Sequence, residues 1–226
     1  MFERLKEDIA AVKEKDPAAR SSLEIYFLYP GFKAVRRHRR AQWFYNRGLF
    51  FIARWISQRT VRKTGIEIHP SAKLGRRVFI DHGTGVVIGA TAEVGDDTVI
   101  YQGVTLGGTG KETGKRHPTI GKNVMIGAGA KVLGPITVGD NSRIAAGSVV
   151  LHDVPENSTA VGTPARVVRR NGVKVSPLDQ IHIPDPVEQE IINISKKICK
   201  IEMYIDGREN KGDKSDRLSE SDTFSD

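Results

Sequence analysis

Two histidines with charged neighbours are the residues whose chemistry stands out in this sequence. Asp81 directly precedes His82, and Arg116 directly precedes His117. Because the ordinary pKa of histidine lies near neutral pH, either imidazole could act as a general base that takes a proton from an attacking hydroxyl group. A base of this kind usually needs a carboxylate that orients it and stabilises its cation. A histidine that only satisfies structural hydrogen bonds is the alternative for His82.

Charged groups of both signs accompany these histidines. The planar guanidinium of Arg116 is suited to a substrate carboxylate, and Asp81 and Asp16 could hold a substrate ammonium. Such a pair of charges suits an amino acid better than a sugar. The nearby glycines would let backbone amides approach a ligand closely, although they are a weak phosphate motif alone. These glycines are Gly107, Gly108 and Gly110.

Metal binding is the other chemistry that histidines can supply. Some proteins hold zinc with three histidines, and His82 and His117 are available for such a site. The remaining histidines are His38, His69, His152 and His182. Because none of them gives a close pair with metal-ligand spacing, we expect no metal site.

A six-residue repeat must position the candidate residues. From residue 68 an aliphatic residue recurs every six positions, often followed by Gly, which matches neither the helical period of 3.6 nor the strand period of 2. The series is Ile68, Leu74, Ile80, Ile88, Val94, Ile100, Leu106, Ile120, Ile126, Val132, Val138, Ile144 and Val150. The repeat predicts short strands and tight turns, with three units closing each coil of a stacked triangular prism. An unusually regular β-sandwich is the alternative.

The repeat breaks at both histidines. Ile80 and Ile88 are eight residues apart, and Leu106 and Ile120 are fourteen apart, so the second segment is expected to leave the prism as a loop. Loops on a rigid scaffold often carry function. Glu67 lies fifteen residues before His82, close to one coil of about eighteen. Since stacked strands lie roughly 4.8 Å apart, Glu67 is the candidate carboxylate partner of His82.

Residues 1–65 lack the repeat and are predicted to form two or three helices. Asp16-Pro17 is a plausible helix start, with Asp as N-cap and Pro at the first helical position. The segment 29–31 is predicted to be a turn. The basic run 36–40 could touch phosphates, but a solvated helix face is the favoured interpretation.

Residues 171–206 are predicted to be a linker and an amphipathic helix, and the polar residues 207–226 a disordered tail. Isoleucines in 185–205 are spaced alternately by four and three positions, which favours a trimeric coiled coil. An equally weighted alternative is that this apolar face packs on the side of the prism. Cys199 is the single cysteine, so no internal disulfide is possible and a reducing compartment is indicated.

The composition excludes few classes of ligand or partner. The formal net charge of +8 fits an anionic ligand, nucleic acid or a membrane surface. Nucleic acid is not expected, because the positive charge is scattered. The N-terminus lacks the apolar region of a secretory signal. The most apolar run, Leu49–Ile56, contains Arg54 and is too short to span a bilayer. We therefore expect a cytoplasmic protein without a membrane anchor.

The motifs together resemble the serine acetyltransferases over residues 14–170. The segments that carry the resemblance are DPAARSSLE, YPGFKAVRRHR, GIEIHPSAKLG, IDHGTGVVIG, VTLGGTGK, RHPTIG, MIGAGAKVLG and GTPAR. The resemblance implies a mainly β fold, a left-handed parallel β-helix of hexapeptide repeats over 66–170, with a helical N-terminal segment over 1–65 and a C-terminal helix.

The resemblance also implies an activity, the transfer of the acetyl group of acetyl-CoA to the hydroxyl of L-serine as the first step of cysteine biosynthesis. Carried over by position, His82 is the base that deprotonates serine, and Glu67 is its carboxylate partner where many members have Asp. His117 lies beside the reacting hydroxyl. Transfer is direct, within a ternary complex, and needs no metal.

The same carry-over implies the binding residues. Asp16 and Asp81 hold the serine ammonium, and Arg116 holds its carboxylate. The implied acetyl-CoA residues are Gly108, Thr109 and Ala128. Both pockets lie between neighbouring subunits of a trimer.

Two departures from long members shape the expected partners. The helical segment is shorter than the one that pairs two trimers into a hexamer, so we expect a homotrimer, with a hexamer as the alternative. The chain ends Phe224-Ser225-Asp226 rather than in Ile, so we do not expect a complex with O-acetylserine sulfhydrylase. The competing functions are acetyl transfer to a sugar or another amino acid, and a non-catalytic scaffold of the same fold.

Overall fold

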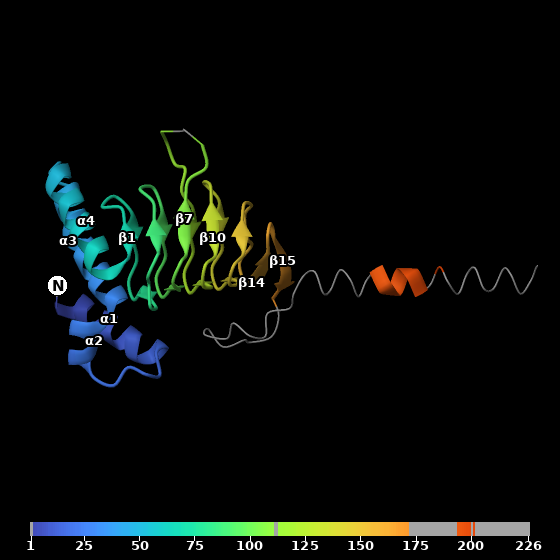
Figure 1. Ribbon diagram of the computed structural model, residues 1–226, viewed down its shortest axis with the longest axis horizontal. Helices are drawn as coiled ribbons and strands as arrows, with labels where there is room; N and C mark the ends of the chain where they lie inside the picture. Colours follow the sequence, from blue (N-terminus) through green and yellow to red (C-terminus); the bar gives the residue numbers. More distant parts are fainter. Residues whose placement is uncertain (1, 111–112, 172–193, 200, 202–226) are drawn as a thin grey trace, which may run out of the picture. The chain divides into compact units, whose positions relative to one another are not determined.

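A computed structural model describes residues 2–110, 113–171, 194–199 and 201 (Figure 1). Four helices, rather than the two or three predicted, precede the first strand. They are α1 (Phe2–Lys15), α2 (Ser22–Leu28), α3 (Pro30–Tyr45) and α4 (Phe50–Thr64). Their boundaries follow common end signals: the Ser21 side chain caps α2, Pro30 opens α3, and Gly65 ends α4 with a φ of 70°.

The predicted helix start at Asp16-Pro17 is wrong. α1 ends at Lys15, and the N-cap of the next helix is Ser21, whose hydroxyl accepts a hydrogen bond from Glu24 N at 3.1 Å. Asp16 uses its carboxylate in a turn instead, where Oδ1 accepts from Ala18 N at 2.8 Å. Asp and Ser favour caps and Asx turns for the same physical reason, so the sequence alone did not separate them.

Within the described residues, fifteen short strands follow the helices. Their bounds are β1 Glu67–Ile68, β2 Lys73–Leu74, β3 Phe79–Ile80, β4 Val87–Ile88, β5 Glu93–Val94, β6 Val99–Ile100, β7 Thr105–Gly107, β8 Thr119–Ile120, β9 Met125–Ile126, β10 Lys131–Leu133, β11 Thr137–Val138, β12 Arg143–Ile144, β13 Val149–Val150, β14 Ser158–Gly162 and β15 Ala165–Arg170. They form three sheets, ordered β1-β4-β7-β10-β13, β2-β5-β8-β11 and β3-β6-β9-β12-β14-β15. From β1 to β13 every third strand pairs in parallel, so three strands make one coil.

Strand register confirms the predicted repeat. Lys131 pairs with Val149, eighteen positions on, as a coil of three six-residue units requires. Glu67 pairs with Val87 after twenty, and Thr105 with Lys131 after twenty-six, so the two breaks add two and eight residues. The second insertion rises from β7 as the long loop in Figure 1. Each of the thirteen repeated aliphatic residues lies on its own strand, β1 to β13.

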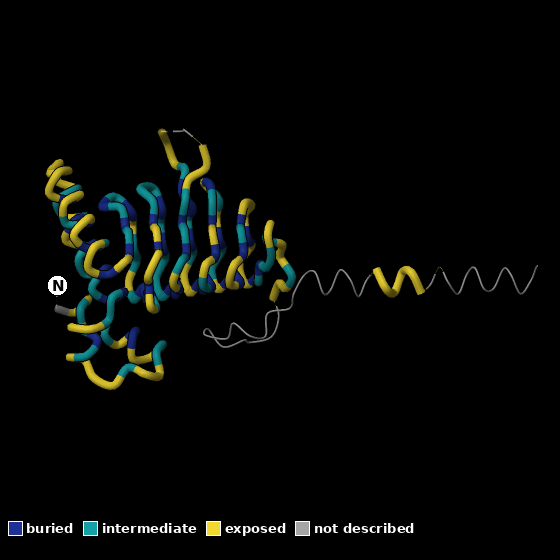
Figure 2. Tube along the Cα trace, viewed as in Figure 1, coloured by how far each residue is buried: buried dark blue, intermediate teal, exposed yellow. Residues whose placement is uncertain are grey.

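The aliphatic residues of the repeat form the core of the prism, and α3 closes its first coil with Ala34 and Val35. Figure 2 shows buried residues along the successive coils. Gly31 lets this helix approach, because a Cβ there would overlap the Ile80 backbone carbonyl. A second apolar cluster joins α1–α3 to the outer side of the β3-β6-β9 sheet, where Phe79 and Met125 are buried. The helices and the prism therefore form one compact unit. A hairpin of β14 and β15 follows the last coil.

The chain from Pro184 onward is a separate unit, in which 194–199 and 201 are helical. Ile194, Ile198 and Ile201 are exposed there. The rest of the predicted amphipathic helix and the predicted tail lie outside the described residues. Within the described part of the chain, no helix has the length and apolar character needed to cross a membrane.

Acid should destabilise the fold through His38, which joins α3 to the prism. Its Nε2 lies 3.1 Å from Ala72 O, and burial lowers its pKa to about 4. The unfolded chain takes up this proton near pH 6.5, whereas the native state resists it. The contribution of neutral His38 to the free energy of unfolding is therefore present above that pH and is lost as the pH falls toward 4. We expect a loss of about 2 kcal/mol between pH 7 and pH 5 from this group.

Urea unfolding at the two pH values and constant protein concentration measures this loss. In His38→Gln the acid-dependent loss should shrink by that amount, whatever the variant's stability at pH 7. An unchanged pH dependence in the variant would assign the acid sensitivity to other groups.

Candidate active site

His82 lies at the corner of the prism between β3 and β4, in an uncommon backbone conformation. Its φ is 53°, and the flanking Gly83 N donates to Asp81 O at 2.5 Å, which makes His82 the centre of a γ-turn. Glycines at 83 and 85 also have positive φ, so the extra residues of the first register break form this turn. The turn projects the imidazole outward, and the side chain is 77% exposed.

A cluster of two carboxylates and a tyrosine lies beside His82. Asp81 Oδ1 is 3.9 Å from His82 Nε2, and Tyr29 donates from its hydroxyl to Asp16 Oδ2 at 2.7 Å. Burial raises the pKa of Asp81, the His82 imidazole opposes the rise, and the Asp16 carboxylate adds to it. Burial and the bond to Asp16 also raise the pKa of Tyr29, which therefore stays a hydrogen-bond donor. A cation placed here would relieve the repulsion between the carboxylates.

Lys15 fixes the end of α1 and with it the position of Asp16. Its ammonium group donates to Asp97 O at 2.8 Å and to Arg77 O at 3.2 Å, at a corner of the prism. The side chain is only 10% exposed, and burial lowers its pKa while Asp97 opposes the shift. A largely buried lysine that binds backbone carbonyls anchors a chain segment firmly, so the position of the next residue, Asp16, is also fixed.

His117 lies at a different corner, where the long loop returns to β8, and it is buried. Thr91 N donates to His117 Nδ1 at 3.2 Å, so in the neutral ring the proton lies on Nε2. The Thr91 hydroxyl lies 2.9 Å from Nδ1 and accepts from the amides of Arg116 and His117, both at 3.1 Å. Burial lowers the pKa of His117, and Arg116 and Lys115 add to the shift. The ring is therefore held neutral, as an Nε2–H donor.

A cavity of about 640 Å³ lies at the His117 corner, and Arg116, Thr91 and Tyr45 line it. Gly108 packs close to Arg116, since a Cβ there would lie 3.1 Å from Arg116 Cγ. His117 packs still more closely on Gly89, where a Cβ would overlap the imidazole ring. These glycines let two loop side chains lie directly on the prism.

The structure does not form the predicted contact between Glu67 and His82. Glu67 opens β1, and its Oε1 accepts from Arg54 of α4 at 3.3 Å. The fifteen-residue spacing falls short of the local coil, which is twenty residues long, so the next-coil partner of Glu67 is Val87 rather than His82. Among the described side chains, the carboxylate nearest His82 is that of Asp81. The Glu67–His82 pair stays a prediction.

The three residues predicted to bind acetyl-CoA are divided between the two corners. Gly108 and Thr109 begin the long loop, on the His117 side, and Thr109 lies beside Gly134. Ala128 follows β9, two coils beyond the β3–β4 turn, and packs against the cluster that contains Tyr101 and Met125. The structure therefore does not bring all three together within one copy of the chain.

The candidate residues form two half-sites. The His82 half contains Asp16, Asp81 and Tyr29; the His117 half contains Arg116 and Thr91. Sequence reasoning missed Tyr29, Lys15 and Thr91. Tyr29 and Lys15 adjoin segments that were already singled out, Pro30 and Asp16, but only the fold shows that they meet. Thr91 gave no signal, since it follows an ordinary repeat unit. Within the described ranges, no group of three or more His, Cys, Asp or Glu could hold a metal ion.

Comparison with known proteins places this geometry in a family. Residues 117–152 match the family described as bacterial transferase hexapeptide (six repeats). A serine acetyltransferase of Synechococcus elongatus is 54% identical over 207 residues, which cover 92% of this chain and 85% of the relative.

Two solved structures add ligands to the comparison. Serine acetyltransferase of Brucella abortus in complex with coenzyme A is 47% identical with a TM-score of 0.74, over 76% of this chain and 69% of that one. The Neisseria gonorrhoeae enzyme in complex with serine is 43% identical with a TM-score of 0.72, over 74% and 69%. The prism is thus the left-handed parallel β-helix that the family resemblance implied, and the chain belongs to the serine acetyltransferase family of hexapeptide-repeat acyltransferases.

Proposed function

We propose that this protein transfers the acetyl group of acetyl-CoA to the hydroxyl of L-serine and releases O-acetyl-L-serine and CoA, the first step of cysteine biosynthesis. One observation carries the proposal at the site: an exposed imidazole, His82, adjoins the paired carboxylates of Asp16 and Asp81. This is a base beside a place for an ammonium group. Relatives named serine acetyltransferase, and solved structures with serine or coenzyme A, support the same substrates.

On this proposal, the substrate's charges orient it. Asp16 and Asp81 bind the serine ammonium, and Tyr29 holds Asp16 in place through its 2.7 Å hydrogen bond. Arg116 binds the serine carboxylate with a bidentate fork. Gly108, Thr109 and Ala128 contact acetyl-CoA. A sugar would leave these charges uncompensated, which disfavours the alternative acceptors.

The chemical step follows from the positions of the two histidines. His82 takes the proton of the serine hydroxyl as its oxygen attacks the thioester carbonyl. The tetrahedral intermediate then expels the CoA thiolate, which receives the proton from His82, so the enzyme returns to its starting state. His117 donates from Nε2–H beside the reacting oxygen, since Thr91 binds its Nδ1. Glu67 is proposed as the carboxylate partner of His82 in the complex with both substrates.

The division of the site supports a trimer. His82 and His117 lie at different corners of one prism, so a complete site needs the His82 half of one copy and the His117 half of its neighbour. A homotrimer closes such a head-to-tail contact with three equivalent sites. We further propose that the enzyme is cytoplasmic and needs no metal.

Thiol release from acetyl-CoA, followed with serine as the acceptor, tests the proposed function. Serine-dependent release, with O-acetylserine as the product, is expected. Threonine, homoserine and simple sugars serve as comparison acceptors. A folded protein that releases no thiol with serine but does so with another acceptor would move the assignment to that acceptor. If thiol is released with none of the tested acceptors, the non-catalytic scaffold becomes the favoured function.

Replacing Arg116 should weaken serine binding selectively. A hydrogen bond to a charged group contributes about 1.5–3 kcal/mol, so Arg116→Gln should raise the serine KM by roughly 10- to 150-fold. The acetyl-CoA KM, measured at saturating serine, should change little. Arg116→Lys is the matched control, since it keeps the charge and loses the fork, and its serine KM should lie between. Equal effects on both substrates would place Arg116 outside the carboxylate site.

Tyr29→Phe should also raise the serine KM, but less. The variant removes only the hydroxyl that orients Asp16, and one such bond contributes about 0.5–1.5 kcal/mol, or roughly 2- to 10-fold. Steady-state kinetics in both substrates measures the effect, with the acetyl-CoA KM as the internal control. If the hydroxyl acts through Asp16, the double variant with Asp16→Asn should be no worse than Asp16→Asn alone. Additive losses would give Tyr29 a separate role.

A further inference from the structure

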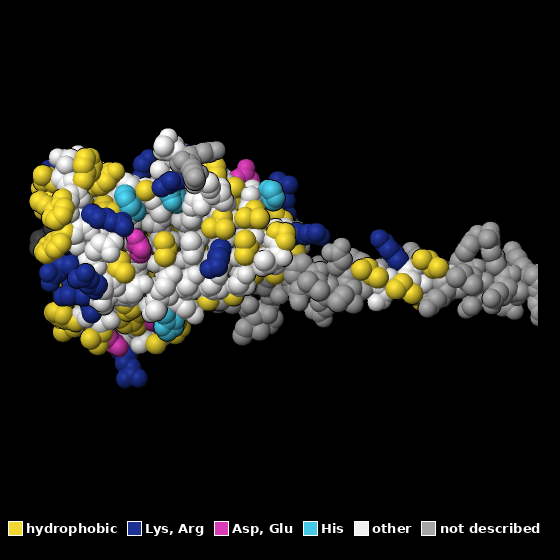
Figure 3. Space-filling model, turned by 45° about the horizontal axis from the view of Figure 1, so that its top comes forward, with side chains coloured by type: hydrophobic (Ala, Val, Ile, Leu, Met, Phe, Trp, Pro, Cys, Tyr) yellow, Lys and Arg dark blue, Asp and Glu magenta, His cyan; other side chains and the backbone are white. Residues whose placement is uncertain are grey.

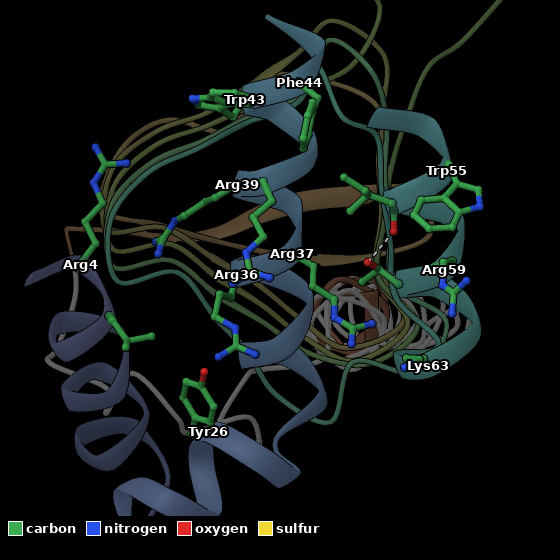
Figure 4. A pocket seen from close by; sticks show the side chains of 14 residues that line it. Arg4, Tyr26, Arg36, Arg37, Arg39, Trp43, Phe44, Trp55, Arg59 and Lys63 are labelled. Atoms are coloured by element: carbon green, nitrogen blue, oxygen red, sulfur yellow. Dashed lines mark hydrogen bonds between the residues drawn. The ribbon is translucent and has the colours of Figure 1, made fainter. Parts of the chain in front are cut away.

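A second cavity, of about 1060 Å³, lies on the helices rather than at either half-site (Figure 4). It is formed around α3, with α1 and α2 on one side and α4 on the other. We call it the basic-aromatic pocket. Cations line it together with four aromatic side chains, Tyr26, Trp43, Phe44 and Trp55. Figure 3 shows Lys and Arg side chains gathered beside apolar side chains over this helical end of the unit.

The pocket carries an uncompensated positive charge. Seven cationic residues line it, and none of its described lining residues is acidic. Six of them are Arg4, Arg36, Arg37, Arg40, Arg59 and Lys63. Among the described residues only the seventh, Arg39, forms an ion pair with a carboxylate, the buried Asp8, and Arg4 lies near enough to Glu7 to help lower the pKa of that carboxylate. The whole chain has a net charge of only +8, so this pocket holds much of its excess. Such a concentration attracts and stabilises a multiply charged anion.

The aromatic side chains add a second kind of recognition. Trp43 and Trp55 are 49% and 53% exposed, which is unusual for residues that gain so much from burial. The Arg36 guanidinium lies 4.1 Å from the Tyr26 ring centroid, and that of Arg59 lies 4.9 Å from the Trp55 centroid. Planar cations that lie over aromatic rings form a surface on which a heteroaromatic base can also stack.

One polar atom in the pocket lacks a partner. Arg36 Nε is buried, and no described atom accepts a hydrogen bond from it. A buried donor without an acceptor costs about 1–3 kcal/mol, and a phosphate oxygen would remove that cost only if it bound Nε itself. Arg36 belongs to the basic run 36–40, whose favoured interpretation from the sequence was a solvated helix face. In the structure His38 packs inward, and the four arginines of the run line the pocket.

We propose that the basic-aromatic pocket is a binding site for a nucleoside polyphosphate, separate from the acetyl-CoA site. The arginines bind the phosphates as bidentate forks, and a tryptophan stacks on the base. The pocket's volume matches a small ligand rather than an extended strand, and inorganic polyphosphate would leave the exposed aromatic surface unused.

The two tryptophans of the chain, Trp43 and Trp55, make the test direct, since both line the pocket. Energy transfer from tryptophan to N-methylanthraniloyl-ATP reports binding next to them, and unlabelled ATP should displace the probe. We expect saturable binding that weakens at least tenfold in the double variant Arg40→Gln/Lys63→Gln. The matched control, Lys6→Gln/Arg62→Gln, removes the same charge from exposed positions on α1 and α4 outside the pocket lining, and it should bind as the wild type does.

Several results would overturn the proposal. Equal weakening in both double variants would mean non-specific attraction, and displacement by tripolyphosphate as effective as by ATP would mean an anion site without base recognition. Binding of a short single-stranded oligonucleotide but not of ATP would assign the pocket to nucleic acid. Probe binding that is lost as the protein self-associates at rising concentration would mean that a second copy covers the pocket. A parallel rise in the acetyl-CoA KM of Arg40→Gln/Lys63→Gln would make the pocket part of the acetyl-CoA site.

Discussion

His82→Asn should lower kcat for serine-dependent thiol release by about 10²–10⁴-fold, the usual contribution of a general base. Without a base, the serine hydroxyl must lose its proton to water as the bond forms, which raises the barrier of the chemical step. The KM values should change little, because Asp16, Asp81 and Arg116 remain. Steady-state kinetics with both substrates varied, on protein whose melting temperature has been checked, measures the effect.

The choice of asparagine matters for this experiment. Residue 82 has a φ of 53°, a left-handed conformation that Asn adopts more readily than Ala. His82→Ala would combine loss of the base with a strained turn, whereas Asn mainly removes the base. His152→Asn is the matched control, since His152 is exposed at the far end of the prism. If His82→Asn keeps wild-type kcat, the base lies elsewhere, and His117→Asn would be examined next.

The prism could be predicted from the sequence because its period is unlike that of any other element. Thirteen aliphatic residues at six-residue spacing define strands, coils and the two breaks together, and each falls on its own strand. The handedness of the prism could not be predicted in this way, because the repeat alone does not determine it. That expectation came from the family resemblance.

The structure of the helical segment is harder to predict, because each of its local sequence patterns is compatible with more than one structure. Asp16-Pro17 has the composition of a helix start, yet it forms the turn after α1. The run 36–40 has the composition of a solvated face, yet α3 uses one side of it, at His38, to pack on the prism. In both cases long-range packing decides among local options of similar energy.

The site could be predicted in its residues but not in its contacts. His82, Asp81, Arg116 and His117 are recognisable from their types and their places in the register breaks. Which groups meet depends on the corner of the prism that each break occupies. Glu67 illustrates the limit, since α4 brings Arg54 to its carboxylate and no spacing argument anticipates that helix.

The separation of the half-sites leads to the second large effect, restored activity in mixed oligomers. His82→Asn and Arg116→Gln inactivate different halves, so each homo-oligomer should be nearly inactive at low serine. In a randomly mixed trimer, a site with an intact His82 from one subunit and an intact Arg116 from its neighbour forms with a probability of about one in four. We therefore expect about a quarter of wild-type activity from oligomers formed by co-expression of the two variants.

This recovery discriminates between the two arrangements of the site. If both halves of a site came from the same subunit, every subunit would carry one defect, and mixing could give no more than the mean of the two inactive parents. Mixing the purified, already assembled variants is the control, since activity should appear only as subunits exchange. Differently tagged subunits, purified through both tags in succession, give only mixed trimers, in which one site of the three is intact, so about a third of wild-type activity is expected after this purification. Activity at the parental level in such oligomers would place a complete site within one prism, which would require the long loop to carry Arg116 and His117 from their corner to that of His82.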